Sequence, residues 1–299
     1  MLTRRTFLKS MIGGAIGLAG IAAYPFVEVL ARPRVTRYSL KPSGWTDGLR
    51  LRICALADFH ACEPWMSLSR IKSICEQANS LDADIILLLG DYAAGTRLVS
   101  EYVNSADWSR ALASLQAPFG VHAILGNHDY WEDLTFQKDQ RSENIAAGAL
   151  KNVGIATYVN ETVRLEKDGR AFWIAGLGDQ MALLPGSAYG RASFVGIDDL
   201  HGTLSQVTDD APVLLMAHEP DIFPRVPDRV SLTLCGHTHG GQINILGWRP
   251  GAASAGSRRY PVGHYREENR DMIVSKGLGC SIIPVRIGAW PEILLIDLG

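Results

Sequence analysis

Five short polar clusters occur in a fixed order along the chain, and each follows a run of apolar residues. They are Asp58-Phe59-His60, Gly90-Asp91-Tyr92, Gly126-Asn127-His128-Asp129, His218-Glu219-Pro220 and Gly236-His237-Thr238-His239. Short continuous apolar runs are typical of strands buried on both faces. Segments that follow parallel strands meet at the carboxyl edge of the sheet, where ligands bind in open α/β folds. The pattern therefore predicts that these carboxylate, amide and imidazole groups gather at one edge.

Strand-like and helix-like segments alternate through much of the chain. Apolar runs at 49–57, 84–89 and 121–125 predict buried strands, and residues 67–80 and 104–116 carry apolar side chains at helical spacing. We expect a further helix at 141–152, a hairpin of 161–165 with 171–175, a loop at 178–196 that borders the site, and strands at 213–217, 232–235, 242–245, 272–275 and 293–297. Such alternation is typical of βαβ units. The expected fold is α/β, with two packed mixed β-sheets flanked by helices in one domain spanning 49–299.

The first thirty residues differ from the rest. A basic head with Arg4, Arg5 and Lys9 precedes an uncharged stretch rich in Gly, Ala and Ile that runs from 10 to 27. This order is typical of an export signal, and Arg-Arg followed by Phe-Leu-Lys resembles the twin-arginine signal, which a receptor reads as an address. A buried helix or a plain anchor is the alternative, since an apolar run of about 17 residues is at the lower limit for spanning a bilayer. We assign residues 1–35 to a signal or anchor and 36–48 to a linker, and leave cleavage open.

Charge and cysteine usage exclude some classes of function. The net charge of −2 and the pI of about 6.4 provide no general basic field, so no nucleic-acid partner is expected. The five cysteines are scattered and lack C-x-x-C spacing, so they indicate neither a disulfide framework nor a zinc knuckle. Cys54 and Cys235 lie in apolar strand-like runs and fit core positions, while Cys62 fits a loop thiol that could also lie near the polar clusters.

The residue types and spacing within the clusters favour metal binding. Asp58 and His60 are two residues apart, so their side chains point the same way in extended backbone, as do those of His237 and His239. Each residue alone has an ordinary explanation as a helix cap, a turn residue or a hydrogen-bonded structural histidine. Together, mixed oxygen and imidazole ligands favour manganese, iron or zinc. A shared aspartate can hold two divalent ions about 3.5–4 Å apart, which activates a bridging water and neutralises charge on a phosphoryl group.

The order D-x-H, G-D, G-N-H-D, H, G-H-x-H resembles the calcineurin-like metallophosphoesterase superfamily. The strings at 126–131 and 236–242 look most like its exported bacterial YkuE/YaeI-like branch. The tail string at 276–279, with Arg286 and Pro291-Glu292, looks like the same branch but is less specific. The similarity runs from about residue 49 to the C-terminus, and it implies the αββα sandwich of this superfamily.

The resemblance also implies a role for each site residue. One ion would be held by Asp58, His60, Asp91 and His239, and the other by Asp91, Asn127, His218 and His237, with Asp91 bridging. His128 would be the general acid that protonates the leaving oxygen, and Asp129 would orient His128. The implied activity is hydrolysis of a phosphodiester, pyrophosphate or phosphomonoester by attack of a metal-bridged hydroxide.

One departure from the superfamily pattern bears on the substrate. Members that act as protein Ser/Thr phosphatases typically follow the bridging aspartate with an Asp-Arg pair, whereas this chain has Tyr92-Ala93-Ala94-Gly95. Phosphoprotein substrates are therefore not expected. Arg97, Arg258, Arg259 and Arg286 are candidates for contacting phosphate, and the sequence does not choose among them.

The expected partners are a phosphorylated small molecule or a lipid-linked phosphate, together with the twin-arginine export machinery. The N-terminal segment could add membrane association. The expected location is the periplasm, the cell envelope or the extracytoplasmic face of a membrane. Two other functions remain open: a metal-dependent phosphate-binding protein without turnover, and a nuclease of the same superfamily.

Overall fold

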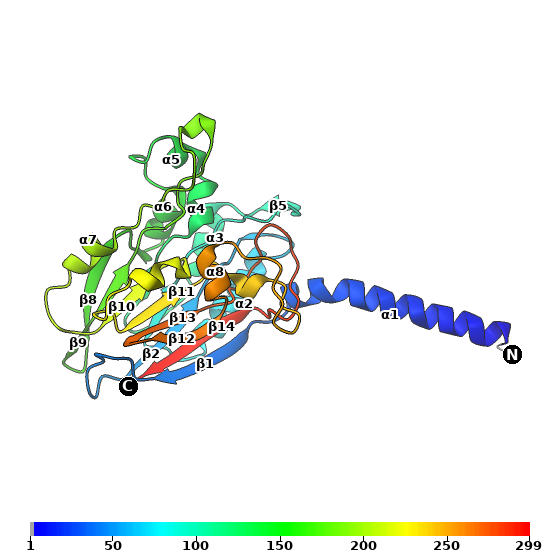
Figure 1. The fold of residues 1–299 in the computed structure, drawn as a ribbon, viewed down its shortest axis with the longest axis horizontal. Coiled ribbons are helices and arrows are strands. Elements are labelled where there is room, and N and C mark those ends of the chain that lie inside the picture. The colour runs from blue at the N-terminus through cyan, green and yellow to red at the C-terminus, as the bar shows by residue number, and fades with distance from the viewer. Residues whose placement is uncertain (1–2) are drawn as a thin grey trace.

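Two six-stranded sheets form the centre of the structure, a computed structural model that describes residues 3–299 (Figure 1). The strand order of the first sheet is β1 (Arg34–Leu40), β14 (Glu292–Leu298), β2 (Leu51–Leu56), β4 (Ile85–Leu88), β6 (Val121–Ala123) and β7 (Ala156–Thr157). That of the second is β12 (Gly263–Glu267), β13 (Arg270–Val274), β11 (Leu232–Cys235), β10 (Val213–Met216), β9 (Arg170–Gly176) and β8 (Glu161–Lys167). A short ribbon pairs β3 (Cys62–Glu63) with β5 (Glu101–Tyr102).

Both sheets are mixed, as the sequence predicts. In the first sheet β2, β4, β6 and β7 are parallel, while β14 runs antiparallel to β2 and parallel to β1. In the second, β9, β10, β11 and β13 are parallel, and the edge strands β8 and β12 are antiparallel to their neighbours. The expected hairpin is the β8–β9 pair. Because the central strands of each sheet are parallel, the loops that follow them share an edge.

Helices cover the outer face of each sheet and complete four layers. The first sheet is covered by α2 (Leu68–Asn79), α3 (Ser105–Leu112) and α6 (Ile145–Asn152), through a buried cluster that joins Ile71, Trp108 and Leu150 to Leu56 and Leu88. The second is covered by α7 (Leu200–Ser205), α8 (Ala255–Arg259) and the 3₁₀ turn η2 (Pro220–Arg225). Between the sheets lies a separate apolar cluster built from alternate strand residues. The remaining elements are α4 (Asn127–Trp131), α5 (Leu134–Lys138), η1 (Ser187–Tyr189) and η3 (His239–Gly241).

The structure contains several short elements that were not predicted, and three differences concern the strands. Strand β1 occupies part of the segment 36–48 that was expected to be a linker, and it pairs with β14 over its whole length. Its residues are half-exposed or exposed, so this edge strand lacks an apolar run. Strand β12, also an exposed edge strand, was not predicted. Residues 242–245 do not form the expected strand; they make only isolated bridges, Ile243 with Ile287 and Ile245 with Trp248.

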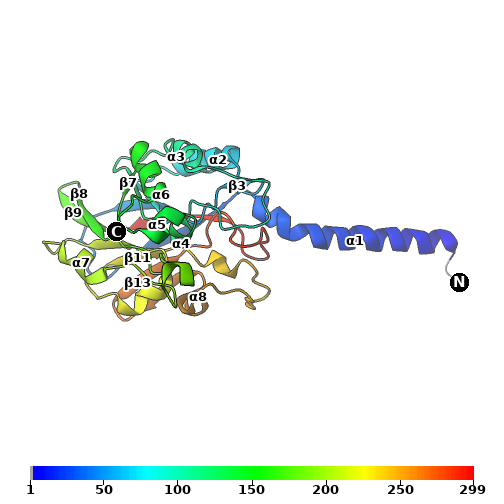
Figure 2. The same ribbon diagram turned by 90° about the horizontal axis from the view of Figure 1, so that it is seen from above.

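A single helix extends away from the body at the N-terminus. Helix α1 (Arg4–Leu30) contacts the rest of the molecule only near its C-terminal end, and both views show it leaving the body as a rod (Figures 1 and 2). It is long and apolar enough to cross a membrane, and its most apolar stretch is exposed. A signal sequence and a membrane anchor share these properties.

Candidate metal centre

Polar residues from both sheets meet where the parallel strands end. Asp58 follows β2, Asp91 follows β4, and Asn127 begins α4 after β6; His218 follows β10, and His237 follows β11. Asp58, Asp91, His237, His60 and His239 all have positive φ, between 50° and 67°. Non-glycine residues rarely adopt this conformation, and it clusters at functional sites where the surrounding structure holds it in place.

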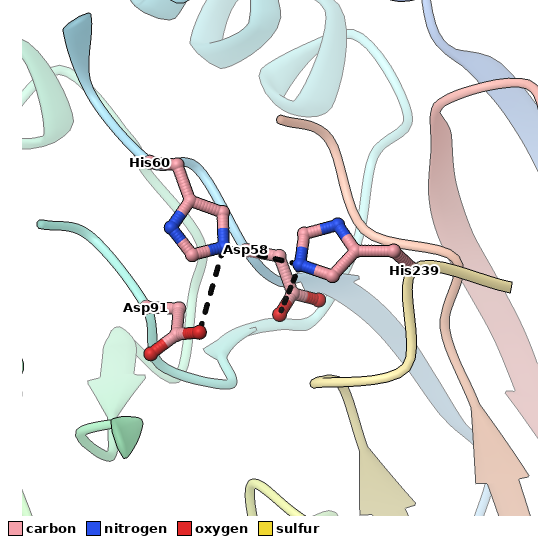
Figure 3. A group of neighbouring side chains, drawn as sticks. All are labelled: Asp58, His60, Asp91 and His239. Atoms are coloured by element: carbon pink, nitrogen blue, oxygen red, sulfur yellow. Dashed lines mark hydrogen bonds and ion pairs between the residues drawn. The ribbon is translucent and has the colours of Figure 1, made fainter. Parts of the chain in front are cut away.

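The first group contains Asp58, His60, Asp91 and His239, and its donor atoms all lie within 4.8 Å of one another. His60 Nε2 is 3.1 Å from His239 Nε2 and 3.5 Å from Asp91 Oδ2. His239 Nε2 is 3.7 Å from Asp58 Oδ1. Figure 3 shows the four side chains converging from the loop that carries Asp58 and His60 and from the loops that carry Asp91 and His239. Two imidazole nitrogens and two carboxylates that face one another without apolar atoms between them form a site that a cation would fill.

The second group contains Asp91, His218 and His237, whose donor atoms also lie within 4.8 Å of one another. His218 Nε2 is 3.2 Å from Asp91 Oδ2. The Asn127 side chain is buried beside this group, with its Oδ1 atom 2.9 Å from His237 Nδ1. Asp91 belongs to both groups, so the seven side chains form two adjoining sites with one common carboxylate.

Backbone carbonyls set the orientation of two of the histidines. His60 Nδ1 lies 3.0 Å from Ala93 O, and His218 Nδ1 lies 2.7 Å from Leu89 O. A carbonyl can only accept, so each Nδ1 carries the proton and donates it. In the neutral form of each ring, the Nε2 lone pair is then directed toward the carboxylates, as a metal ligand requires.

Hydrogen bonding and pKa shifts both fit a bound cation. Within residues 3–299, Asp58 Oδ2, His218 Nε2 and His237 Nε2 are buried atoms without a hydrogen-bond partner. Such atoms are costly in a folded protein unless an ion or water satisfies them. Burial raises the pKa of Asp58 to about 7, and it lowers the pKa values of His60 and His237 to about 3. Neutral imidazoles beside a carboxylate oxygen that lacks a partner are suited to ligate a metal.

Asp91 and His218 are held in their charged forms by each other. Burial opposes both charges, but the nearby His218 holds the pKa of Asp91 well below its usual range, and Asp91 raises that of His218 well above. A divalent cation would replace the His218 proton as the partner of the Asp91 carboxylate. The donor set therefore fits two divalent cations.

His128 lies beside the two groups but its ring is not part of either. Its Nε2 atom is 3.1 Å from Ser281 Oγ, and its Nδ1 atom is 3.7 Å from a carboxylate oxygen of Glu132, the residue that follows α4. Burial opposes the charged form of His128, yet Asp91 and Glu132 together raise its pKa. Neither Ser281 nor Glu132 was identified from the sequence, although the i,i+4 spacing of His128 and Glu132 is the pattern of a helical ion pair.

The expected contact between Asp129 and the His128 imidazole is absent from the part of the chain that the structure describes. Instead, both carboxylate oxygens of Asp129 accept backbone hydrogen bonds. Oδ1 accepts from the N–H groups of Tyr92 and Ala93, and Oδ2 accepts from those of Asp91 and Gly126, all at 2.9 Å. Asp129 therefore fixes the two loops that carry Asp91 and Asn127. The prediction that it orients His128 directly is wrong, because the loop amides occupy its acceptor sites.

Glycine makes room for the ligands. Gly277 has φ +67°, and a Cβ atom at this position would lie 2.5 Å from Asp58 Oδ2. Only glycine combines this backbone conformation with so close an approach to a carboxylate.

A cavity of about 370 Å³ opens onto the site. Asp91, Asn127, His128, His237 and His239 line its polar side, and Trp131, Met181, Phe194 and Ile282 line its apolar side. Phe194 and Met181 come from the long loop at 178–196 that was expected to border the site. A cavity with reactive groups on one wall and apolar groups on the other suits a ligand that has a polar and an apolar part.

The four candidate arginines occupy different environments. Arg286 is fully buried and donates hydrogen bonds to carbonyl oxygens of Lys276, Gly279 and Ala289, so it is not free to reach a phosphate. Its Nη2 atom lies 3.3 Å from His239 Nδ1. Burial, His60 and Arg286 hold the pKa of His239 well below its usual range. Arg97, Arg258 and Arg259 are exposed, and Arg259 pairs with Glu267.

Cys62 is a buried free thiol, and burial raises its pKa to about 11.

Comparison with known proteins agrees with this geometry. The model of the calcineurin-like phosphoesterase family matches residues 51–241, which contain every candidate ligand. The uncharacterized metallophosphoesterase YkuE of Bacillus subtilis is 31% identical over 99% of this chain and 98% of its own length. Phosphodiesterase YaeI of Escherichia coli is 25% identical over the full length of both chains. A transmembrane protein with metallophosphoesterase domain from Danio rerio is 28% identical over 94% of this chain and 60% of its own length. The chain therefore belongs to the calcineurin-like phosphoesterase family, in the branch that its motifs predict.

Proposed function

We propose that this protein is a dinuclear-metal phosphoesterase that hydrolyses a phosphodiester or pyrophosphate of an envelope component, and phosphomonoesters less well. The observation that carries the proposal is the common carboxylate of Asp91 in two buried donor groups. Asp58, His60, Asp91 and His239 would hold one ion, and Asp91, Asn127, His218 and His237 the other. Manganese, iron and zinc all suit this donor set. Bound there, two divalent ions would activate water for attack and neutralise charge on the phosphoryl group.

The chain's own groups would supply the proton for the leaving oxygen. His128 Nε2 faces Ser281 at the wall of the cavity, and neighbouring carboxylates raise the pKa of the ring. A protonated imidazole in this position can donate its Nε2 proton to the oxygen that departs from phosphorus. Asp129 would act indirectly, by holding the backbone that positions Asp91 and His128.

Apolar residues support a substrate with an apolar part next to the phosphoester. Trp131 and Phe194 stack with ring centroids 5.1 Å apart, and His128 packs edge-on against Trp131. A free phosphate or a small phosphomonoester would leave this wall uncovered. A diester or pyrophosphate of an envelope lipid would cover it, which is why we rank these substrates first.

Export and membrane attachment belong to the same proposal. The Arg4-Arg5 pair at the start of α1 fits a twin-arginine signal, which would place the site in the periplasm, the cell envelope or the extracytoplasmic face of a membrane. This route carries folded proteins, so the buried metal centre could be assembled before export.

Hydrolysis of a chromogenic phosphodiester with added Mn²⁺ or Zn²⁺ tests the activity. We expect turnover by the wild-type chain and by His201→Asn, an exposed histidine in α7 that does not line the cavity, but little by His128→Asn. Metal-loaded protein that turns over no diester, monoester, pyrophosphate or lipid-linked substrate would contradict the proposal. If that protein still bound a phosphate analogue, it would instead be a metal-dependent binding protein.

A further inference from the structure

The base of α1 is part of the folded domain. Glu28 is only 2% exposed, and its carboxylate accepts hydrogen bonds from the backbone N–H groups of Gly288 at 3.0 Å and Ala289 at 3.3 Å. One helical turn earlier, Pro25 O accepts from the backbone N–H of Arg286 at 3.2 Å. A buried carboxylate that accepts backbone hydrogen bonds is costly to undo, because its partners lose their only acceptor.

A second set of contacts holds the end of the same helix. The Arg70 guanidinium donates to the carbonyl oxygens of Val29, Leu30 and Ala31, at 2.6 to 2.9 Å. These carbonyls lie at the end of a helix, where no intrahelical donor remains for them. Phe26 stacks on Trp65 with ring centroids 5.7 Å apart. The last two turns of α1 are therefore anchored to the domain by two independent sets of contacts.

The length of α1 leaves no spacer between membrane and domain. Between Lys9 and Glu28 lie 18 uncharged residues, from 10 to 27. At about 1.5 Å per residue they span about 27 Å. The hydrocarbon core of a bilayer is about 30 Å thick. If this stretch crosses a bilayer, the domain surface around Glu28 must rest directly against the lipid headgroups.

Three connected loops lie beside the base of α1, and we call them the collar: residues 94–98, 242–248 and 281–287. They are joined by hydrogen bonds, with Arg97 N donating to Ile282 O and Asn244 N donating to Ile287 O. The Trp65 indole links the stack on Phe26 to the first loop, through a 2.6 Å bond to Leu98 O. In Figures 1 and 2 the orange and red-brown loops lie beside the blue base of α1.

Large apolar side chains of the collar point outward. Leu98, Trp248 and Ile282 are 64%, 63% and 60% exposed, and Leu246 is fully exposed. Scattered exposed apolar residues are ordinary on a protein surface, but a group on one face marks an interaction site.

Two of these residues have an unfavourable backbone conformation. Leu246 has φ +52° and Ile282 has φ +65°. Leu246 sits at the tip of a tight turn in which Ile245 and Trp248 exchange two backbone hydrogen bonds of 3.0 Å. Such turns favour Asn or Gly, and a positive φ is an outlier for a β-branched residue such as Ile282. Folding gains nothing from an exposed apolar side chain in this conformation, so the strain indicates a role outside the isolated domain.

We propose that the collar is a membrane-contacting surface and that α1 is retained as an anchor that seats it on a phospholipid bilayer. The apolar tips of Leu98, Leu246, Trp248 and Ile282 lie at the level of the interface, where a Trp side chain is favoured. The exposed Arg97 beside Leu98 suits lipid phosphates. Arg4, Arg5 and Lys9 lie at the other end of α1, so the positive charge stays on the side from which the chain was exported.

The collar also borders the metal centre. Gln242, Ser281 and Ile282 line the cavity that contains the metal-binding residues. With the collar on the bilayer, the cavity opens at headgroup level and receives a phosphoester that remains in the membrane. This last step rests on the proposed phosphoesterase activity, whereas the surface itself does not.

Site-specific labels test the surface in the full chain. All five native cysteines are buried, so an environment-sensitive fluorophore can be attached to Leu246→Cys, with Leu134→Cys as the control. Leu134 is also an exposed apolar residue, but it lies in α5, which both views place away from the base of α1. In nanodiscs of phosphatidylethanolamine and phosphatidylglycerol, the label at 246 should shift to the blue and be quenched by spin-labelled lipids, and the label at 134 should do neither. The proposal is overturned if the emission of the label at 246 does not shift, or if it shifts but is not quenched by the spin-labelled lipids. A shift without quenching would indicate that a protein partner or a second copy covers the collar.

Two further measurements address the anchor and the substrate. The mass of the exported protein should correspond to a chain that still contains residues 1–30. A mature chain that begins after Ala31 would contradict the proposal that α1 is retained as an anchor. Leu98→Ser combined with Leu246→Asp should lower hydrolysis of a vesicle-borne phospholipid phosphoester several-fold, while hydrolysis of a soluble chromogenic diester stays the same. Equal loss on both substrates, or no loss on either, contradicts the link between collar and substrate. Absence of all hydrolysis by wild type would refute the proposed activity and leave the fluorescence result to decide the surface.

Discussion

Asp91 Oδ1 accepts a hydrogen bond of 2.9 Å from the backbone N–H of His128. The other oxygen of the same carboxylate faces His218 and His60. One side chain thus joins the two metal-binding groups and also fixes the start of the helix that carries the expected general acid. Metal binding and proton donation are for this reason geometrically linked.

Asp91→Asn should remove metal from both groups. The amide keeps the shape of the side chain but lacks the charge that two cations require from their common ligand. We expect the bound metal, measured by elemental analysis of purified protein, to fall from two ions toward one or none. Activity should fall by more than the ~10–100-fold typical of a change outside the ligand shell. Asp168→Asn, in an exposed hairpin turn, is the matched control and should keep both ions. Full metal content in Asp91→Asn would show that Asp91 is not the common ligand.

His128→Asn should separate catalysis from metal binding. We expect kcat to fall by about 10²–10⁴-fold, the range for loss of a general acid, because the amide of Asn cannot supply the proton. Metal content should stay at the wild-type level. The loss should shrink for a substrate whose leaving group is a good one and needs no proton. An equal loss for good and poor leaving groups would argue against general acid catalysis by His128.

Gly277→Ala should weaken metal binding through the position of Asp58. A Cβ atom would lie 2.5 Å from Asp58 Oδ2 and 2.6 Å from Asp58 Cβ, so the carboxylate must move. Gly154→Ala is the control, because Gly154 also has a positive φ, +79°, but no atom lies within 4 Å of the added Cβ. Both variants should lose about 1–2 kcal/mol from backbone strain. Only Gly277→Ala should need a higher metal concentration to reach half-maximal activity; an equal requirement in both would contradict this account.

The buried ring of His122 should lower the free energy of unfolding at mildly acidic pH. The ring is buried, with Nε2 2.7 Å from Phe119 O and Nδ1 2.8 Å from the Tyr158 hydroxyl, and burial lowers its pKa. Because the unfolded chain takes up a proton near the usual histidine pKa and the folded chain does not, stability falls as pH drops below about 6.5. Urea unfolding of wild type and His122→Gln from about pH 7 to about pH 5 checks this. The variant should lose less stability over that interval, and parallel curves would refute the role of His122.

The sequence predicted the centre of the molecule better than its edges. The buried strands that end at Asp58, Asp91 and His218 have continuous apolar runs, and the residues that follow such runs are placed by the sheet itself. Strands β1 and β12 lie at sheet edges with one exposed side, so their pattern resembles that of a loop. Pairing with β14 and β13, which is remote in sequence for β1, decides their structure.

The roles of neighbouring side chains were harder to predict than the ligands. Asp129 is adjacent to His128 in sequence, but at the start of α4 its carboxylate is closer to free backbone N–H groups than to the ring. Ser281 approaches His128 from a loop that lies 153 residues further along the chain. Contacts of this kind depend on how loops from two sheets pack, which no local pattern records.

Arg286 has one further consequence. Its backbone N–H holds Pro25 in α1, and its guanidinium lies against His239 in the metal centre. If metal binding and docking of the helix base are coupled through Arg286, the coupling is reciprocal, and each stabilises the other by the same free energy. With such coupling, metal binding should stabilise the docked base of α1, and displacement of that base should lower the affinity for metal. The chain would then be most completely assembled only where it has both its cations and its membrane.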